Sequence, residues 1–470
     1  MHSHSYSSLD CGMKLNRKLF SDSDTAKKVH CGRTKAEAIV ENVLAPHSLK
    51  IVLDELHDVA FAVATDASNH GNHKMFPVAV QYYHCTKGIH NKLIDFYEDP
   101  DETAEAVSQK LIDVIGKHGL QIQNVSAYTA DNAAVNYGKN KSVYKILTKE
   151  NPGIIKANCN CHIIHNAARH ACKTLKFDVE NLVLKVYSEF SVSAKRSVEL
   201  QACFDFLEMN PDGVLRHVVT RWLSLFPAVD KLLARWPAVK LYFLNKGEDE
   251  CPMVVWDFVR DDADELSDDT GTKLSVPECY LYFVHHFMHV MHTAVLFLES
   301  NAVFSTDVHS HMCQLRAKLS NRIQDKFYGG KLASSLKHLQ ANDQAAFTAQ
   351  ALQVYSRALD YLTKWYDFDA SPLKNFSILK LDTDDRTDFE QILNLAQQLN
   401  IAVDNDALYD EVCALNIAKP QLRSLEKPLD EKWAEFFSRS MCENLKKVVG
   451  RVLSIPERSK SRLRSTGHTM

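Results

Sequence analysis

The stretch VAFAVATDASNHGNHKMFPVAVQYYHCTKGIHNKLIDFY, residues 59–97, decides the fold class. It contains three apolar runs, at 59–65, 76–83 and 91–97, separated by segments rich in Asn, His and Gly. Apolar runs of this length between turn-forming residues predict β-strands. We therefore expect three strands, with the acidic residue Asp66 directly after the first.

A helix and a fourth strand follow this stretch. Asp99 is expected to cap the helix, with Pro100 at its first position, and apolar residues then recur at helical spacing until Gly119. The run NVSAYTA, residues 124–130, predicts a strand that ends just before Asp131. The order strand, strand, strand, helix, strand predicts an α/β fold, a mixed sheet with flanking helices.

Asp66 and Asp131 occupy the same place relative to their strands, 65 positions apart in the chain. Side chains at strand ends of an α/β sheet project into the crevice beside it, so the two carboxylates can meet. Paired carboxylates suit a divalent cation such as Mg²⁺ or Mn²⁺, and two such ions clamp a phosphate during in-line displacement. Aspartate is also a common turn residue, and turn capping accounts for both positions equally well.

The sequence pattern changes after residue 226, where apolar residues recur at helical spacing and the strand pattern ends. We expect four regions: an N-terminal segment at 1–50, the first part of the core at 51–240, an all-helical insertion at 241–430, and a C-terminal helix with a basic tail at 431–470.

The composition of the chain limits its expected partners and cellular compartment. The net charge is −4, so any contact with nucleic acid must come from local basic patches. The 12 cysteines are scattered, which fits reduced thiols in the nucleus or cytosol. Charge or histidine interrupts the apolar runs before the roughly 18 residues of a membrane span. We therefore expect no membrane partner.

A stretch rich in Cys and His, ANCNCHIIHNAARHACKTL, covers residues 157–175. Four residues in it resemble zinc ligands: Cys159, Cys161, His162 and His165. Their spacing departs from standard zinc sites, because the adjacent Cys161 and His162 cannot easily bind one tetrahedral ion together. If a helix begins near His162, one stripe of it carries these residues: His162, His165, Arg169 and Lys173. That stripe suits phosphate contact, although a solvated polar face is the commoner meaning of such a pattern.

Arg221 and Trp222 are adjacent in RHVVTRWLSLFPAVDKLLARW, residues 216–236. Tryptophan can stack on an unpaired base, and arginine can hold a phosphate. A core position is the more frequent role of tryptophan.

Five motifs together give the chain a resemblance to the hAT transposase superfamily, in its finger-associated branch. In chain order they are ATDASNHGNHKMFPVAVQYY, AYTADNAAVNYG, CNCHIIHNAARHA, FSVSAKRS and LRHVVTRWLSLFPAVDKLL. The resemblance covers roughly residues 35–245 well and the remainder loosely. It implies an RNase H-like core interrupted by a long helical insertion, in a transposon-derived nuclear protein.

The resemblance also implies a DDE-type reaction, in which two Asp and one Glu hold Mg²⁺ or Mn²⁺ for cleavage and joining of DNA strands. Asp66 and Asp131 match the first two family acids. Cys159 and His162 match the family's CxxH signature, and Arg221 with Trp222 match its RW signature, whose Trp is associated with a base taken out of the DNA stack. Arg169 joins these as an expected DNA contact.

The sequence departs from the family near its C-terminus. The family pattern IPxSxxxxERxFS carries the third acid, and alignment on Ile455 and Pro456 puts Leu463 at that position. Glu457 is acidic but lies six places too early. The family's dimerisation helices look largely missing, which leaves the oligomeric state open, and no BED-type finger precedes the core.

Loss of a metal ligand weakens and misplaces a catalytic ion. We therefore expect a domesticated or degenerate protein that binds DNA, or nuclear proteins through its helical insertion, without transposition activity. The alternative is a metal-dependent DDE transposase or nuclease with another acid in the third place.

Overall fold

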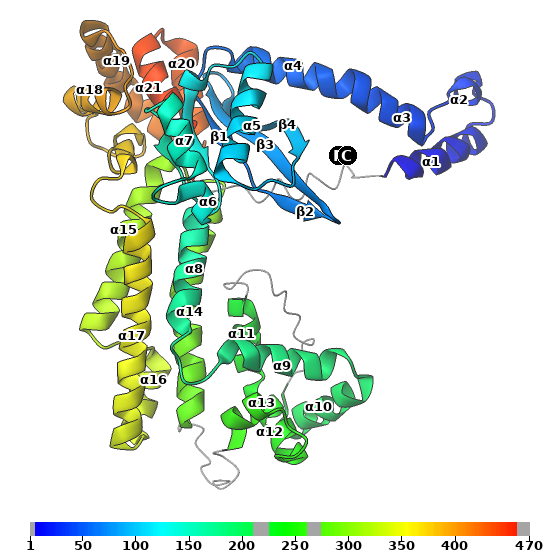
Figure 1. Cartoon of the computed structure of the whole chain (residues 1–470), viewed down its shortest axis with the longest axis vertical. Helices are drawn as coiled ribbons and strands as arrows, with labels where there is room; N and C mark the ends of the chain where they lie inside the picture. Colours follow the sequence, from blue (N-terminus) through cyan, green and yellow to red (C-terminus); the bar gives the residue numbers. More distant parts are fainter. Residues whose placement is uncertain (1–4, 210–224, 261–273, 458–470) are drawn as a thin grey trace. The chain divides into compact units, whose positions relative to one another are not determined.

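The computed structural model describes residues 5–209, 225–260 and 274–457, and it has a mixed α/β architecture (Figure 1). The chain forms two compact units. The first, here called the sheet unit, comprises residues 1–159, 304–306 and 375–470. The second, the helical unit, comprises residues 160–303 and 307–374.

The sheet unit contains six strands and several groups of helices. Its strands are β1 (Phe61–Ala64), β2 (Ser68–His70), β3 (His73–His84), β4 (Gly88–Glu98), β5 (Val125–Thr129) and β6 (Ile155–Lys156). Before and between them lie α1 (Tyr6–Leu19), α2 (Asp24–Lys28), α3 (Arg33–Ile39), the π-helical η1 (Val40–Leu44), α4 (Ala45–Leu56), α5 (Ala104–Lys117), η2 (Ile122–Asn124), α6 (Ala134–Tyr137) and α7 (Val143–Glu150). After the helical unit come η6 (Pro372–Leu379), which spans the boundary, and α18 (Phe389–Gln398), α19 (Asn405–Ser424), α20 (Leu429–Arg439) and α21 (Glu443–Leu453).

The sheet has the strand order β4-β3-β1-β5-β6, and β2 also pairs with β3. β3 is antiparallel to β1, β2 and β4, whereas β5 is parallel to both of its neighbours, β1 and β6. All five residues of β5 are buried, as expected of a central strand covered on both faces. The expected strands at 59–65, 76–83, 91–97 and 124–130 are confirmed, within a residue or a few at each end.

The segment after β1 differs from the turn that the sequence predicted. β1 and β2 pair with β3 in one continuous alignment, Ala64 with Ala79 and Ser68 with Met75, which places Asp66 opposite Pro77. Proline has no backbone N–H to donate to a ladder, so the pairing is interrupted there and resumes at β2. Asp66 therefore lies in a break between two short strands.

Helix α5 begins later than the sequence predicted. Its N-cap is Thr103, whose hydroxyl accepts a hydrogen bond from the backbone N–H of Ala106, whereas Asp99 accepts one from the N–H of Asp101. The prediction of Asp99 as the cap was wrong, because three side chains within five residues can all cap and only one matches the helix start. The stop at Gly119 is confirmed by its φ of 70°.

The C-terminal helices complete the sheet unit. Gln81 on β3 donates to the carbonyl of Leu453 at the end of α21, and the buried hydroxyls of Ser126 on β5 and Ser454 are 2.6 Å apart. Just beyond this end of β3, the β3–β4 turn is held by α20, where a carboxylate oxygen of Asp430 accepts from the N–H of Ile89. The last two helices thus contribute to the core that positions the strands.

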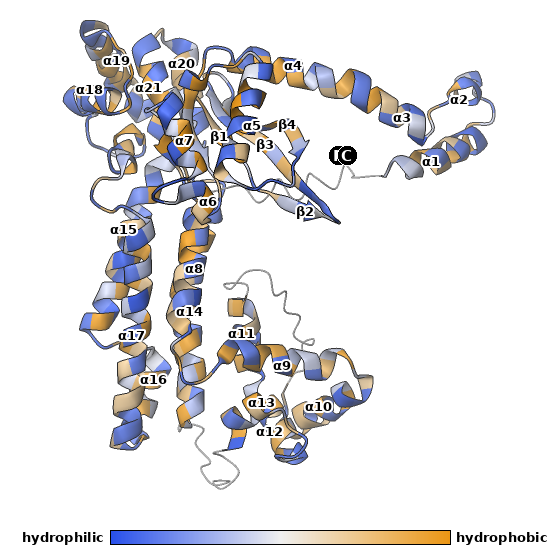
Figure 2. Cartoon of the chain, viewed as in Figure 1, coloured by the Kyte–Doolittle hydropathy of each residue, from blue (hydrophilic) through white to orange (hydrophobic). Residues whose placement is uncertain are grey.

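The helical unit contains α8 (Asn160–Cys172), α9 (Val179–Ser191), α10 (Ala194–Phe206), α11 (Leu225–Ala234), α12 (Trp236–Lys246), α13 (Met253–Val259), α14 (Val276–Glu299), α15 (Ser305–Gln324), α16 (Gly330–Ser335), η5 (Leu336–His338) and α17 (Ala341–Trp365). α8 packs along α17 and also contacts α14. Figure 2 shows hydrophobic and hydrophilic residues mixed along α17, as expected of a helix with one buried face.

Helix α14 is long and apolar enough to cross a membrane, with a mean hydropathy of 1.3 over its best window. It is the single such helix in the described part of the chain, and 56% of that window is buried within the protein. Buried core helices pass the same test, so α14 is a weak indication of a membrane span. The four histidines in it do not lower its hydropathy as far as the sequence analysis assumed.

The unit boundaries differ from the expected insertion at 241–430. The helical unit begins at Asn160, because the buried face of α8 packs against α14 and α17. It ends at Lys374, because α18 to α21 belong with the sheet. Periodicity identifies a buried helix face, but it does not say which unit covers that face.

Candidate carboxylate site

Asp66 and Asp131 lie at equivalent positions beyond two neighbouring parallel strands. Ala64 on β1 is paired with Thr129 on β5, and each aspartate comes two residues later. The N–H of Thr65 donates to the carbonyl of Thr129, which extends the pairing toward both carboxylates. Both aspartates are half-buried. The sheet register therefore brings the two predicted acids to the same edge.

The carboxylate of Asp131 is fixed by local hydrogen bonds. Its Oδ1 accepts from the N–H of Ala133 at 3.2 Å and from Nδ2 of Asn136 at 2.7 Å. The hydroxyl of Tyr128 donates to Oδ1 of Asn136 at 2.8 Å, which orients that amide. Among the described residues nothing donates to the second carboxylate oxygen, so one oxygen is held and the other is left for a ligand.

Tyr137 anchors the turn that carries Asp131. Its buried hydroxyl donates to the carbonyl of Tyr128 and accepts from the N–H of Ala130, both at 3.0 Å. Burial, and after it the charges of neighbouring groups, raise the pKa of Tyr128 and of Tyr137 well above that of free tyrosine. Both phenols therefore stay protonated and act as fixed donors around Asp131.

A second set of bonds brings Cys159 to the same turn. The N–H of Cys159 donates to the carbonyl of Ala130, and the carbonyl of Cys159 accepts from Nδ2 of Asn132 at 3.0 Å. Asn158 in turn donates to Oδ1 of Asn132. Cys159, the first residue of the CxxH signature, is buried and lies beside the Asp131 turn through its backbone. Its expected role as a DNA contact does not fit a 2% exposed side chain.

The fit of a divalent metal to this edge is partial. Two carboxylates are present, and the hydroxyl oxygen of Thr129, two residues before Asp131, is buried without a hydrogen-bond partner in the described structure. Hydroxyl and carboxylate oxygens suit Mg²⁺ and Mn²⁺. Across the described residues, however, no three His, Cys, Asp or Glu side chains lie close enough to hold a metal ion. The four candidate zinc ligands in residues 159–165 are described residues and form no such group either.

The remaining predicted residues fall elsewhere. His162 is half-buried and Arg169 is exposed, both on α8 of the helical unit, and the expected stripe continues to the exposed Lys173. Arg221, Trp222 and Leu463 lie outside the described residues. The third family acid is therefore not located, and Glu457, the nearest acid in the sequence, is buried.

Sequence reasoning missed the residues that orient Asp131. Asn132, Asn136 and Tyr137 all lie in AYTADNAAVNYG, the motif already singled out for its aspartate. An asparagine directly after an acid and another five residues after it is a signal for a hydrogen-bonded turn, since asparagine readily bonds nearby backbone. The sequence alone could not show that Asn136 turns back to the carboxylate.

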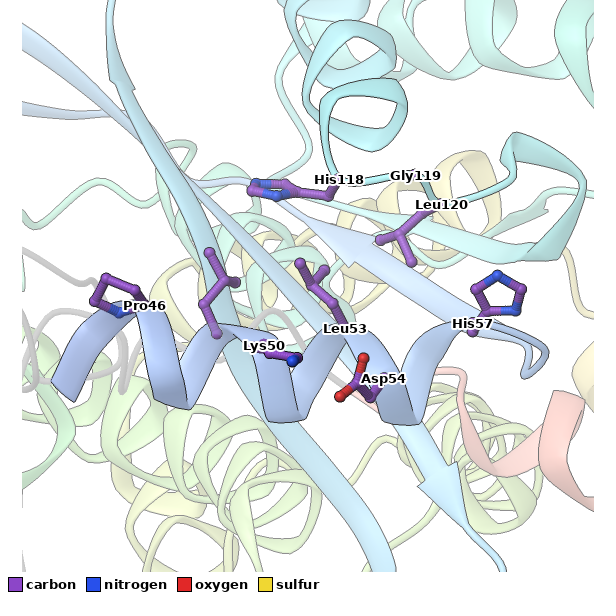
Figure 3. Close-up of a pocket in the computed structure, with 9 residues that line it drawn as sticks. Pro46, Lys50, Leu53, Asp54, His57, His118, Gly119 and Leu120 are labelled. Carbon is purple, nitrogen blue, oxygen red and sulfur yellow. The ribbon is translucent and has the colours of Figure 1, made fainter. Parts of the chain in front are cut away.

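A separate open pocket of about 450 Å³ lies in the sheet unit between α4 and the end of α5 (Figure 3). Pro46, Lys50, Leu53 and Asp54 of α4, with His57 just after it, face His118, Gly119 and Leu120 across the pocket. Four of the lining side chains are polar (Lys50, Asp54, His57 and His118), and none belongs to the carboxylate site.

No known protein-family model matches the chain, and no curated protein resembles it closely enough to be counted as a relative.

Proposed function

We propose that the chain is a transposon-derived protein of the hAT type that binds DNA, or nuclear partners, without carrying out transposition. The observation that carries this proposal is the placement of Asp66 and Asp131 at equivalent positions beyond the neighbouring parallel strands β1 and β5. An RNase H-like core with two acids at its sheet edge is what the motif resemblance implies.

The division of the chain also supports the proposal. A helical unit inserted between β6 and the last helices interrupts the sheet unit, and the chain then returns to complete it. The resemblance implies this order of core, helical insertion and return helix. The same resemblance implies a nuclear location, and the 12 free cysteines fit either the nucleus or the cytoplasm.

The absence of transposition follows from the incomplete set of acids. Leu463 stands where the family pattern has its third acid, and aliphatic side chains do not bind Mg²⁺. A two-metal clamp without its third ligand loses the positioning on which its rate depends. The alternative, a metal-dependent DDE transposase or nuclease, retains Asp66 and Asp131 and requires another acid, and the free oxygen of Asp131 and the buried hydroxyl of Thr129 favour it.

Titration calorimetry with MnCl₂ on the wild type, Asp66→Ala and Asp131→Ala separates the two functions. The proposal predicts no tight Mn²⁺ binding, DNA affinity that is unchanged in the double variant, and no nicking of supercoiled plasmid in Mg²⁺ or Mn²⁺. Mn²⁺ binding that depends on both aspartates, together with nicking, would establish the enzyme instead. Failure of the wild type to bind any DNA or nuclear protein would reject the proposal itself.

A further inference from the structure

One side of the helical unit carries cations from two helices that are far apart in sequence. Arg169 lies on α8 and Lys173 directly follows the last residue of α8, both exposed, and α17 supplies Arg357 and Lys364. A guanidinium nitrogen of Arg357 lies 3.0 Å from Nε2 of His170, which joins the two helices at this face. We call this set of side chains, with His170, the α8–α17 basic face.

The positive charge of this face is not neutralised within the described structure, where none of its four cations forms an ion pair. Residues 157–177 contain no acid, and residues 344–366 contain one, the exposed Asp360. Burial, and then the charges of Arg357, Lys173 and Lys364, lower the pKa of His170. The positive charges of these cations thus disfavour protonation of the His170 ring, which Arg357 contacts directly.

Aromatic rings lie among these cations. Tyr361 is 5.5 Å from the ring of His170 and 6.2 Å from the ring of Trp365, and Lys364 lies 5.9 Å from the centre of the Trp365 ring. Tyr361 comes four residues after Arg357, and Lys364 and Trp365 come three and four residues after Tyr361, so all four lie toward one side of α17. Both rings are half-buried and still reach solvent.

We infer that the α8–α17 basic face binds single-stranded DNA, with its cations on the phosphates and the Tyr361–Trp365 pair against an unpaired base. Alternation of cations and aromatic rings is how proteins bind single strands without reading their sequence, because every base has a flat face. A duplex offers its phosphates but keeps its bases stacked, so the aromatic pair would have no partner there. This inference rests on the proposed function in one respect, that the partner is DNA.

The cations and the aromatic rings of the α8–α17 basic face should affect DNA binding in two different ways. Uncompensated cations on a rigid helix pair attract any polyanion, whereas stacking requires exposed rings on that polyanion. The charged residues should therefore set the salt dependence, and Trp365 should set the preference for single strands. These two effects can be measured separately.

The test measures binding of a fluorescein-labelled oligothymidylate of about 20 nucleotides, long enough to exceed the footprint of a typical single-strand module, and of a duplex of equal length. We expect Arg169→Glu with Lys173→Glu to weaken oligothymidylate binding at least ten-fold and to reduce the slope of log affinity against log salt by about 1.4, for two lost phosphate contacts. Trp365→Leu should weaken oligothymidylate binding about ten-fold, with duplex binding nearly unchanged.

The matched control is Lys318→Glu with Lys337→Glu, which changes charge equally at two exposed lysines of the same unit that do not act on His170. It should leave affinity within about two-fold, apart from the general effect of net charge. Circular dichroism confirms that each variant keeps its helix content.

Wild-type binding to DNA that is equally insensitive to the face and control variants overturns this inference and leaves the proposed function standing. Binding to the duplex as tightly as to the oligothymidylate, with Trp365→Leu silent, also overturns it. No binding of either DNA by the wild type removes both the inference and its premise.

Discussion

Asp131 in the sheet unit and Arg169 in the helical unit are both polar residues of candidate sites, and their surroundings differ in kind. Asp131 is half-buried, and its Oδ1 accepts from Asn136 and from the N–H of Ala133. Arg169 is exposed on a face that collects like charges and lacks ion pairs in the described structure. The hydrogen bonds around Asp131 hold one carboxylate oxygen in one direction. The cations around Arg169 instead produce a positive electrostatic potential over the whole face.

The difference shows what each unit can contribute to function. Orientation by hydrogen bonds is useful where one atom must face one ligand, and it fails when a single donor is lost. The positive potential of several unpaired cations is only reduced when one cation is lost. It weakens with salt and attracts any polyanion. Changes in the sheet unit should therefore have large and local effects, while changes in the helical unit should be graded.

The largest effect is expected at Gly88 in the β3–β4 turn. Its φ is 81°, and an added Cβ would lie 2.5 Å from a carboxylate oxygen of Asp430. Gly88→Val should destabilise the sheet unit by about 3 kcal/mol, through backbone strain and loss of the α20 contact, measured by urea unfolding. Gly71→Ala is the matched control, because Gly71 also has a positive φ but open space around it, and should cost about 1 kcal/mol. Equal losses in both would show that the Asp430 contact is unimportant.

Tyr137→Phe tests the hydrogen bonds behind Asp131. It removes a buried hydroxyl that serves both Tyr128 and Ala130, which should cost about 2 kcal/mol in unfolding free energy. Tyr97→Phe provides the comparison, since the buried hydroxyl of Tyr97 lacks a hydrogen-bond partner in the described structure and its removal should cost little. Similar costs for the two variants would contradict the view that the Asp131 turn depends on oriented donors.

As pH falls, the helical unit should lose stability before the sheet unit does. Burial, and then nearby positive charge, lower the pKa of His286 to about 4 from its usual 6.5. Four other histidines of this unit shift in the same direction: His170, His292, His309 and His311. An unfolded chain binds more protons than the folded one between the two pKa values, so stability is lost as pH falls from about 6.5 toward 4. We expect a loss of about 1 to 2 kcal/mol after allowance for solvent screening.

The sheet unit has fewer such groups, namely His84 and His90, and its main acid-sensitive residue is Glu55. Burial alone would raise the pKa of Glu55, but hydrogen bonds from Lys87 and Tyr82 and the charge of Lys87 outweigh burial and hold it at about 2. Its stabilising contribution is therefore lost only as pH falls from about 4.5 toward 2. Hydrogen exchange by peptide at pH 7.5 and 5.5 should show faster exchange in α14 and α15 than in β1 and β5, and the reverse order would refute this.

The smallest effects are expected at helix caps, where the two units should behave alike. Thr103→Ala removes the cap of α5, and Ser275→Ala removes the capping box of α14. Each should cost about 1 kcal/mol in its own unit. Ser5→Ala at the start of α1 should cost little, because the Ser5 side chain makes no capping hydrogen bond. A large cost at Ser275 alone would mean that the helical unit also depends on single oriented bonds.

Local pattern was sufficient to predict the strands, because apolar runs between turn residues need no partner to be recognised. The same pattern placed Asp66 and Asp131 after strands, and the register then put them at one edge. It could not show that Pro77 interrupts the ladder opposite Asp66, since that requires knowing the pairing. The prediction of the N-cap of α5 was wrong because Asp99 and Thr103 are equally good capping residues when only the local sequence is considered.

Contacts between segments that are far apart in the chain could not be predicted from the sequence. Arg357 and Tyr361 meet His170 only because α17 packs along α8, about 190 positions away in the chain. No periodicity links those segments, and a cation on an exposed helix face is normally just solvated. The extent of the helical unit was missed for the same reason, because the partner of a buried face is a tertiary property.

The contact between Ser126 and Ser454 bears on how the protein is made. β5 leaves the ribosome early, yet its buried hydroxyl meets its partner 328 positions later. At 5 to 20 residues per second, that interval is roughly 20 to 60 s. During this time the nascent sheet lacks α20 and α21, while the local contacts of the helical unit are already available. The helical unit can therefore fold first, and the sheet unit is completed only when its final helices have been synthesised.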